Sequence, residues 1–194
     1  MLTKLRPFIM KFIASLAQHI DVDPNNITLI GLALSFFVII FASIESLKIM
    51  VPIMIAFSSI ADMLDGAVAR AKNRVTIWGG VLDSFCDRIE EFNYLLSLMI
   101  LGVDSLLLYF VMLISFLISY LRVLGEKLGV KVEGVGILER GERVILILIS
   151  SLVIVVSESY GVTIAKIVLL TMAFLGIITV IQRLYHIFKA LSKS

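Results

Sequence analysis

The chain has 194 residues, of which 60% are hydrophobic and only 16% are charged, and its mean hydropathy is +1.07. Soluble domains average about 25% charged and about 45–50% apolar residues, so this composition excludes an ordinary water-soluble fold with a polar surface. The net charge is only +2, and we expect the chain to associate with a lipid bilayer and not with nucleic acid. The single cysteine, Cys86, excludes an internal disulfide.

An amphipathic helix is predicted near the N-terminus, within residues 1–22. Its apolar residues recur at helical spacing, and Lys4, Lys11 and Gln18 lie off that stripe. Such a helix is typical of a segment that lies in the membrane interface. A cluster of turn-forming residues at 21–26 ends it. The stripe consists of Leu5, Phe8, Ile9, Phe12, Ile13, Leu16 and Ile20.

Long apolar runs fill the rest of the chain, and a membrane-spanning helix needs about 20 apolar residues. The sequence therefore predicts an all-α integral membrane protein, with an interfacial helix followed by six transmembrane helices within residues 23–194. We find no sign of a second domain, so residues 1–194 are expected to form one membrane domain. The predicted helices are 27–44, 49–71, 77–101, 105–125, 138–156 and 162–186.

The distribution of basic residues predicts the orientation of these helices. With six crossings and the N-terminus inside, every lysine and arginine except Lys48 and Lys166 falls on one side. Cytoplasmic loops of membrane proteins carry such an excess of lysine and arginine. We therefore expect a multi-pass protein of the cell membrane with both termini in the cytoplasm.

Carboxylates stand where the second apolar run ends and the third begins. Asp62 and Asp65 are three residues apart, and Asp83 and Asp87 are four apart. Residues at these spacings share a helix face, so the two pairs can meet if consecutive helices pack side by side. Both pairs then lie at the cytoplasmic end of their helices.

Four carboxylates at membrane depth repel one another and lose their hydration. A hard divalent cation removes both difficulties, because Mg²⁺ and Mn²⁺ prefer oxygen ligands. We therefore expect Asp62, Asp65, Asp83 and Asp87 to bind metal, with two ions about 3.5–4 Å apart, as in many sites of phosphoryl transfer.

Neighbouring residues fit a phosphate ligand beside that metal site. Gly66 and Ala69 leave a helix face bare, so a nucleotide or pyrophosphate can approach the backbone. Gly79 allows the third predicted transmembrane helix to pack closely near its start. Arg70 supplies a positive, bidentate donor for phosphate.

Together these residues form the pattern Asp62-x2-Asp65-Gly66-x2-Ala69-Arg70-x8-Gly79-x3-Asp83-x3-Asp87. This pattern resembles, in full, the signature of the CDP-alcohol phosphatidyltransferase family. The resemblance extends to the six-helix layout and to the interfacial N-terminal helix.

The resemblance implies a set of residue roles. Asp62, Asp65 and Asp83 would bind divalent metal, and Asp87, also near the metals, would be the general base. The CDP group of a CDP-lipid donor, CDP-diacylglycerol or CDP-archaeol, would lie against Asp65, Gly66, Ala69, Arg70 and Gly79. Further donor-binding residues would be Asn25, Asn26, Ile27 and Thr28, in the loop before the first membrane helix, and Thr76, in the loop between the second and third.

The resemblance also implies the reaction. The acceptor hydroxyl gives its proton to Asp87 and attacks the phosphorus atom bonded to the lipid, and CMP leaves. No covalent intermediate with the enzyme is needed.

Three arginines near the ends of later helices point to the acceptor. Arg122, Arg140 and Arg143 fall on the same side of the membrane as the aspartates, and arginines suit an acceptor that carries phosphate. Ser119-Tyr-Leu-Arg122 and Glu139-Arg140-x-x-Arg143 resemble the inositol-phosphate branch of the family, which implies myo-inositol 1-phosphate. That branch often has lysine where Arg122 stands, and glycerol 3-phosphate and serine stay open as acceptors.

Other interpretations stay open as well. Arg140 and Arg143 can be interface anchors paired with Glu139 and Glu142. Intramembrane carboxylates also mark cation or proton transporters, although transporters place them near the midplane, often with repeats in both halves. The family is usually dimeric, so a homodimer is the expected assembly.

Overall fold

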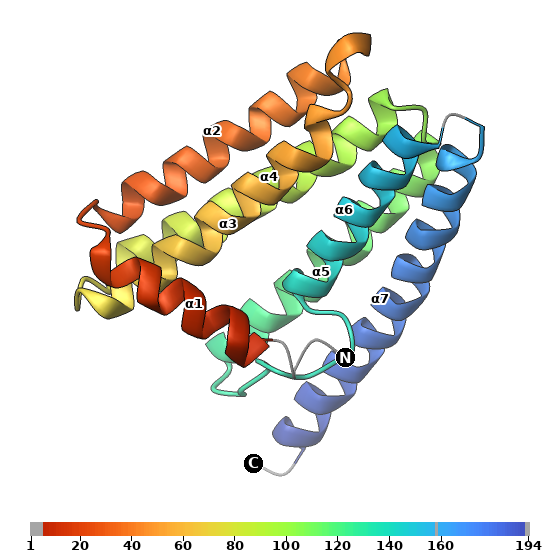
Figure 1. Cartoon of the computed structure of the whole chain (residues 1–194). Helices are drawn as coiled ribbons and strands as arrows, with labels where there is room; N and C mark the ends of the chain where they lie inside the picture. Colours follow the sequence, from red (N-terminus) through yellow and green to blue (C-terminus); the bar gives the residue numbers. More distant parts are fainter. Residues whose placement is uncertain (1–5, 158, 193–194) are drawn as a thin grey trace. The chain divides into compact units, whose positions relative to one another are not determined.

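The protein is described here by a computed structural model, which covers residues 6–157 and 159–192, with side chains from residue 13 onward in those ranges. Within these ranges the chain is all-helical, with seven α-helices and one short 3-10 helix and no strand (Figure 1). It forms two compact units, Met1–Ser97 and Leu98–Ser194.

The first unit is a set of helices arranged around α3. Its elements are α1 (Arg6–His19), α2 (Pro24–Ala42), the 3-10 helix η2 (Glu45–Leu47), α3 (Met50–Ala71) and α4 (Ile77–Ile100), whose last turn passes into the second unit. Both α1 and α2 pack against α3, and α2 runs beside α3 in Figure 1.

The start of α2 differs from the prediction. Asp23 caps the helix by accepting a hydrogen bond from the Asn25 amide at 2.8 Å, and Pro24 occupies its first turn. Proline suits the first helical position because its missing N–H has no helical partner to lose. The four residues Asn25, Asn26, Ile27 and Thr28 therefore lie in the first turns of α2 and not in a loop, so that prediction is wrong.

Helix α1 uses part of its apolar stripe to pack against α3. Ile13 and Ala17 are buried in a cluster with Ile27, Ala61, Ala67 and Val68. Ile20 is partly buried against this cluster, whereas Leu16 is 44% exposed. The earlier stripe residues, Leu5, Phe8, Ile9 and Phe12, lie outside the described side chains.

The second unit is organised around α7. Its helices are α5 (Ser105–Lys127), α6 (Arg140–Val156) and α7 (Gly161–Leu191), and α7 contacts both of the others. Residues 128–139, which join α5 to α6, contribute Val130 and Val132 to a buried cluster with Leu121 and Ile187.

The six predicted apolar segments all form helices, with ends that shift by a few residues. Among the described residues, four helices are long and apolar enough to cross a membrane: α2, α3, α5 and α7. Helix α4 contains several charged residues, and α6 has only 17 residues. The described helices therefore include four candidate membrane spans, whereas the sequence predicted six transmembrane helices.

Candidate metal centre and ligand cleft

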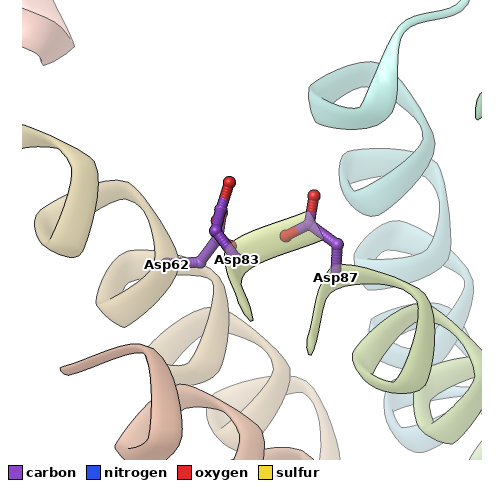
Figure 2. A group of neighbouring side chains, drawn as sticks. All are labelled: Asp62, Asp83 and Asp87. Atoms are coloured by element: carbon purple, nitrogen blue, oxygen red, sulfur yellow. The ribbon is translucent and has the colours of Figure 1, made fainter. Parts of the chain in front are cut away.

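Three of the predicted aspartates converge in space. Asp62 on α3 and Asp83 and Asp87 on α4 each offer a carboxylate oxygen, and these oxygens lie within 4.8 Å of one another. Figure 2 shows the three side chains directed toward a common space between the two helices. These residues are up to 25 positions apart in the sequence, and the fold brings their carboxylates together.

Local structure explains this convergence. Residues 72–76 connect α3 to α4, and Asn73 adopts a positive φ of 54° that turns the chain sharply. The last turns of α3 therefore lie close to the first turns of α4. The spacing of four residues places Asp83 and Asp87 on one face of α4.

The cluster fits a hard divalent cation. It concentrates negative charge from three carboxylates, and Mg²⁺ and Mn²⁺ take oxygen ligands of this kind. Asp87 is 8% exposed, whereas Asp62 and Asp83 are only partly buried, so the site is open to a ligand on one side.

The fourth predicted ligand, Asp65, lies outside this cluster of three. It is 5% exposed, and its carboxylate accepts hydrogen bonds from the Thr28 hydroxyl, at 2.5 Å, and from the Gly66 amide. These donors orient the carboxylate through α2 and through its own helix. The role of Asp65 as a metal ligand stays a prediction.

Asp87 has a partner that the sequence did not single out. The Arg88 guanidinium donates to Asp87 Oδ2 at 3.0 Å, and both side chains are largely shielded from solvent. Adjacent residues on a helix point in different directions, so the sequence alone offered no signal for this pair.

A cleft of about 480 Å³ opens beside the metal cluster, within the first unit. Eight of the ten predicted donor-binding residues line it, whereas Asn26 and Ile27 do not. Asp83 also lines it, which joins the cleft to the cluster. The lining residues are Asp23, Pro24, Asn25, Thr28, Asp65, Gly66, Ala69, Arg70, Arg74, Val75, Thr76, Gly79, Gly80 and Asp83.

Gly79 lies where the first turns of α2 and α4 approach each other. A Cβ at this position would stand 3.0 Å from Thr76 Oγ1 and 3.3 Å from Asn25 Oδ1. Thr76 also accepts a hydrogen bond from the Gly79 amide at 2.9 Å, which caps α4. These short distances agree with the prediction that Gly79 permits a close approach at this helix start.

Arg70 lies over Gly66 on α3. A Cβ at Gly66 would stand 3.2 Å from Arg70 Nη1, and both residues line the cleft. The small side chain thus leaves space for the guanidinium on the helix face. The exposed Arg70 is well placed to meet an anionic ligand there.

The predicted acceptor arginines belong to the second unit. Arg122 is exposed on α5 and donates from Nε to Glu126 at 3.0 Å. Arg143 on α6 is 2% exposed, with Nη2 3.5 Å from Ser119 Oγ on α5. Arg140 is the first residue of α6 and is partly buried.

Sequence reasoning missed a buried polar network behind the carboxylates. Glu90 and Tyr94 on α4 are 1% and 0% exposed. The Tyr94 hydroxyl donates to Ser58 Oγ on α3 at 2.7 Å and lies 3.5 Å from Glu90. Ser58 in turn donates to the Gly31 carbonyl on α2 at 2.7 Å. The sequence offered one signal for this network, namely the polar residues that recur through the apolar helix α4, because buried polar groups need hydrogen-bond partners.

The model of the CDP-alcohol phosphatidyltransferase family matches residues 22–184. The chain belongs to this family. An archaetidylinositol phosphate synthase of Pyrococcus horikoshii is 35% identical over 198 residues, which cover 98% of each chain. As a member of the family, the chain is a CDP-alcohol phosphotransferase, an enzyme of phospholipid synthesis.

The structure of this chain is also similar to solved structures. The Mycobacterium tuberculosis phosphatidylinositol phosphate synthase with CDP-DAG bound is 25% identical, with a TM-score of 0.75, and the match covers 93% of this chain and 94% of that one. The same mycobacterial enzyme in complex with manganese and citrate is 24% identical, with a TM-score of 0.75. That match covers 92% of this chain and 88% of the mycobacterial one. The second comparison shows a likeness of fold.

Proposed function

We propose that the protein transfers the lipid-bearing phosphate of a CDP-lipid to myo-inositol 1-phosphate and releases CMP. The observation that carries this proposal is the convergence of Asp62, Asp83 and Asp87 beside a cleft lined by Gly66, Ala69 and Arg70. The archaeal and mycobacterial relatives named as inositol phosphate synthases support this acceptor.

The cleft is the proposed site of the CDP group. Arg70 and Arg74 bring positive charge to it, and Asn25 and Thr76 bring neutral polar groups. Gly66 and Ala69 let a pyrophosphate approach the α3 backbone. Because the lipid chains of the donor are apolar, they would stay in the bilayer, while the nucleotide occupies the cleft.

The carboxylate cluster is the proposed site of one or two Mg²⁺ or Mn²⁺ ions. Asp62, Asp83 and Asp87 would hold them, and we keep Asp65 in the set because it lines the same cleft as Asp83. When bound, the metal would neutralise the donor pyrophosphate and the charge that develops on the departing CMP.

Asp87 is the proposed general base. It accepts the proton of the acceptor hydroxyl, whose oxygen forms a bond to the phosphorus of the lipid phosphate as the bond from that phosphorus to the CMP oxygen breaks. Arg88 holds one oxygen of Asp87 at 3.0 Å, so the orientation of the carboxylate is set before the acceptor arrives.

Arg122, Arg140 and Arg143 are the proposed ligands of the acceptor phosphate. Guanidinium groups recognise phosphate through paired, charge-assisted hydrogen bonds. Glycerol 3-phosphate carries the same group and is the alternative acceptor. Glycerol 3-phosphate has a smaller polyol than inositol 1-phosphate. Supplying both acceptors to the protein together shows which of them it prefers.

We further propose that α4 and α6 cross the membrane beside the four candidate spans. At about 1.5 Å per residue, the 17 residues of α6 and the 24 of α4 cover most or all of a hydrocarbon core of about 30 Å. Six crossings in a single domain, with α1 in the interface and both termini cytoplasmic, is the proposed arrangement. A homodimer is its proposed assembly.

Release of CMP by the purified protein tests the reaction. CDP-archaeol or CDP-diacylglycerol is supplied with Mg²⁺ or Mn²⁺ and with myo-inositol 1-phosphate, glycerol 3-phosphate or serine in separate reactions. We expect release with inositol 1-phosphate, and loss of release when the metal is chelated.

Variants sharpen this experiment. Asp83→Asn keeps the size of the side chain and removes its charge, and we expect CMP release to fall by about a hundredfold or more while the protein stays folded. Glu45→Gln, at an exposed carboxylate that pairs with Lys48, is the matched control. If CMP is released with glycerol 3-phosphate alone, glycerol 3-phosphate is the acceptor and the proposal of inositol 1-phosphate is wrong. If CMP is released with none of the acceptors, the transferase proposal is refuted.

A further inference from the structure

Residues 128–139, the segment between α5 and α6, lie against α7 through their backbone; we call this segment the strap. Gly134 and Gly136 have φ values of 79° and 110°, which other residues rarely adopt. Val132 and Leu138 are 0% and 1% exposed. The strap is thus an ordered element, and it leads directly into Arg140, the first residue of α6.

Thr179 on α7 holds the end of the strap. Its hydroxyl oxygen accepts hydrogen bonds from the amides of Ile137, at 3.2 Å, and Leu138, at 3.0 Å, and it donates to the Leu175 carbonyl at 2.9 Å. A Cβ on Gly136 would stand only 2.4 Å from the Thr179 methyl carbon. The backbone of the strap therefore lies flush on this fully buried side chain.

Arg183 holds the middle of the strap from the next turn of α7. Its Nε donates to the Val135 carbonyl at 2.9 Å, and its Nη1 donates to the Ile118 carbonyl of α5 at 2.6 Å. Its Nη2 lies 4.0 Å from Glu139 Oε1. Each nitrogen of this 3% exposed guanidinium thus faces a protein acceptor, so Arg183 connects the strap to α5 and α7.

His186 contacts the start of the strap, with Nε2 3.1 Å from the Lys131 carbonyl. Thr179, Arg183 and His186 are spaced four and three residues apart, so they share one face of α7. All three contact backbone atoms of the strap. They form a polar row along an otherwise apolar helix. None of the three residues belongs to the carboxylate cluster or to the cleft of the first unit.

We propose that this polar row positions the acceptor-phosphate arginines and so sets the affinity for the phosphorylated acceptor. The Glu139 carbonyl, at the end of the strap, accepts the Arg143 amide at 3.2 Å, and the Glu139 carboxylate accepts the Gly134 amide at 2.9 Å. The strap thereby determines where α6 begins and where Arg140 and Arg143 stand. This inference rests on the proposed function, which assigns those arginines to the acceptor.

Thr179→Val tests the inference, because valine keeps the shape of threonine and removes the hydroxyl. Initial rates of CMP release are measured against acceptor concentration at saturating CDP-lipid, and against CDP-lipid at saturating acceptor. Loss of two hydrogen bonds to the strap is expected to raise the KM for the acceptor about tenfold and to leave the KM for CDP-lipid unchanged.

Two matched variants serve as controls. Thr179→Ser retains the hydroxyl and is expected to restore an acceptor KM near that of the wild type. Thr171→Val removes an exposed hydroxyl on the same helix, one that donates only to the Ile167 carbonyl of its own helix, and it is expected to change neither KM.

Trypsin cleavage after the exposed Lys131 gives a readout that does not depend on activity. If the row holds the strap, cleavage of the folded protein is faster in Thr179→Val than in the wild type and in Thr179→Ser. If Thr179→Val does not fold, His186→Leu removes the exposed contact to the Lys131 carbonyl. Its acceptor KM is expected to rise about threefold, as for one lost hydrogen bond.

The outcomes separate this inference from the proposed function. A wild-type protein that releases no CMP with any phosphorylated acceptor refutes the proposed function, and the inference falls with it. If the wild type is active, an unchanged acceptor KM in Thr179→Val overturns the inference alone. An equal rise in both KM values also overturns it, because a general loosening of the fold affects both substrates.

Discussion

The hydrogen bond between Thr28 and Asp65 joins two positions 37 residues apart at the wall of the cleft. The Thr28 hydroxyl belongs to the second turn of α2, and Asp65 belongs to the last part of α3. A buried carboxylate needs such donors, since its desolvation is otherwise unfavourable. Thr28 therefore acts on the cleft by fixing the orientation of Asp65.

Thr28→Val is expected to lower CMP release about tenfold, because Asp65 loses a charge-assisted hydrogen bond, which contributes about 1.5–3 kcal/mol. Steady-state rates across a titration of Mg²⁺ measure the effect. Thr28→Ser keeps the hydroxyl and is expected to retain most of the activity. Equal rates of CMP release for Thr28→Val and the wild type would show that the hydrogen bond from Thr28 to Asp65 does not contribute to activity.

Gly79→Ala tests the close approach of the first turns of α2 and α4. The added Cβ would meet Thr76 Oγ1 at 3.0 Å and Asn25 Oδ1 at 3.3 Å, so one of these cleft residues must shift. We expect the KM for CDP-lipid to rise about tenfold, with the acceptor KM unchanged. Gly141→Ala, where an added Cβ meets no atom within 4 Å, is the control, and a donor KM that stays constant in Gly79→Ala would contradict the expectation.

At the scale of elements, polar side chains join α4 to α2 and α3. Asn93 on α4 donates to Ser35 on α2 at 2.8 Å, and Tyr94 donates to Ser58 on α3 at 2.7 Å. Apolar contacts specify little about how far one helix slides along another, because many registers bury similar area. Buried hydrogen bonds have one good geometry, so they favour the register in which Asp62 meets Asp83 and Asp87.

Tyr94→Phe removes the hydroxyl and leaves the Ser58 oxygen without its donor. We expect the free energy of unfolding to fall by about 1–2 kcal/mol, which chemical unfolding in detergent measures. Tyr109→Phe, at a side chain that is 65% exposed on α5, is expected to have no effect. A Tyr94→Phe protein as stable as the wild type would mean that the hydrogen bond adds nothing beyond helix packing.

At the scale of the whole molecule, the distribution of charge predicts how the proposed six crossings are oriented in the membrane. Lysine and arginine flank the cytoplasmic ends of spans because they are retained on that side during insertion. Lys48 stands in the connection between α2 and α3, and Lys127 ends α5. With six crossings, these two positions face opposite sides of the membrane.

Cysteine labelling measures this orientation. Lys48→Cys and Lys127→Cys are introduced separately, and the native Cys86 is buried at 1% exposure, so the wild-type protein serves as the unlabelled control. In sealed right-side-out vesicles, an impermeant thiol reagent is expected to modify position 48 and not position 127. Labelling of both positions from the same side would rule out the six-crossing arrangement.

The sequence by itself determined the helices and the chemistry of the candidate site. Apolar runs of membrane length predict helices whatever their neighbours are, since the backbone must satisfy its hydrogen bonds within each segment. The spacing of Asp83 and Asp87 placed them on one helix face by local geometry alone. The family signature from Asp62 to Asp87 depended on nothing beyond residue order, and the family comparison confirmed it.

Only the tertiary structure decided which of these groups meet. It brought Asp62 to Asp83 and Asp87, and it turned Asp65 toward Thr28. Local periodicity specifies a face but not the partner that covers it, so the burial of Tyr94 and Arg183 among polar partners could not be derived from spacing. Those contacts join residues 36 and more positions apart, and packing alone determines which distant atoms come within hydrogen-bonding distance.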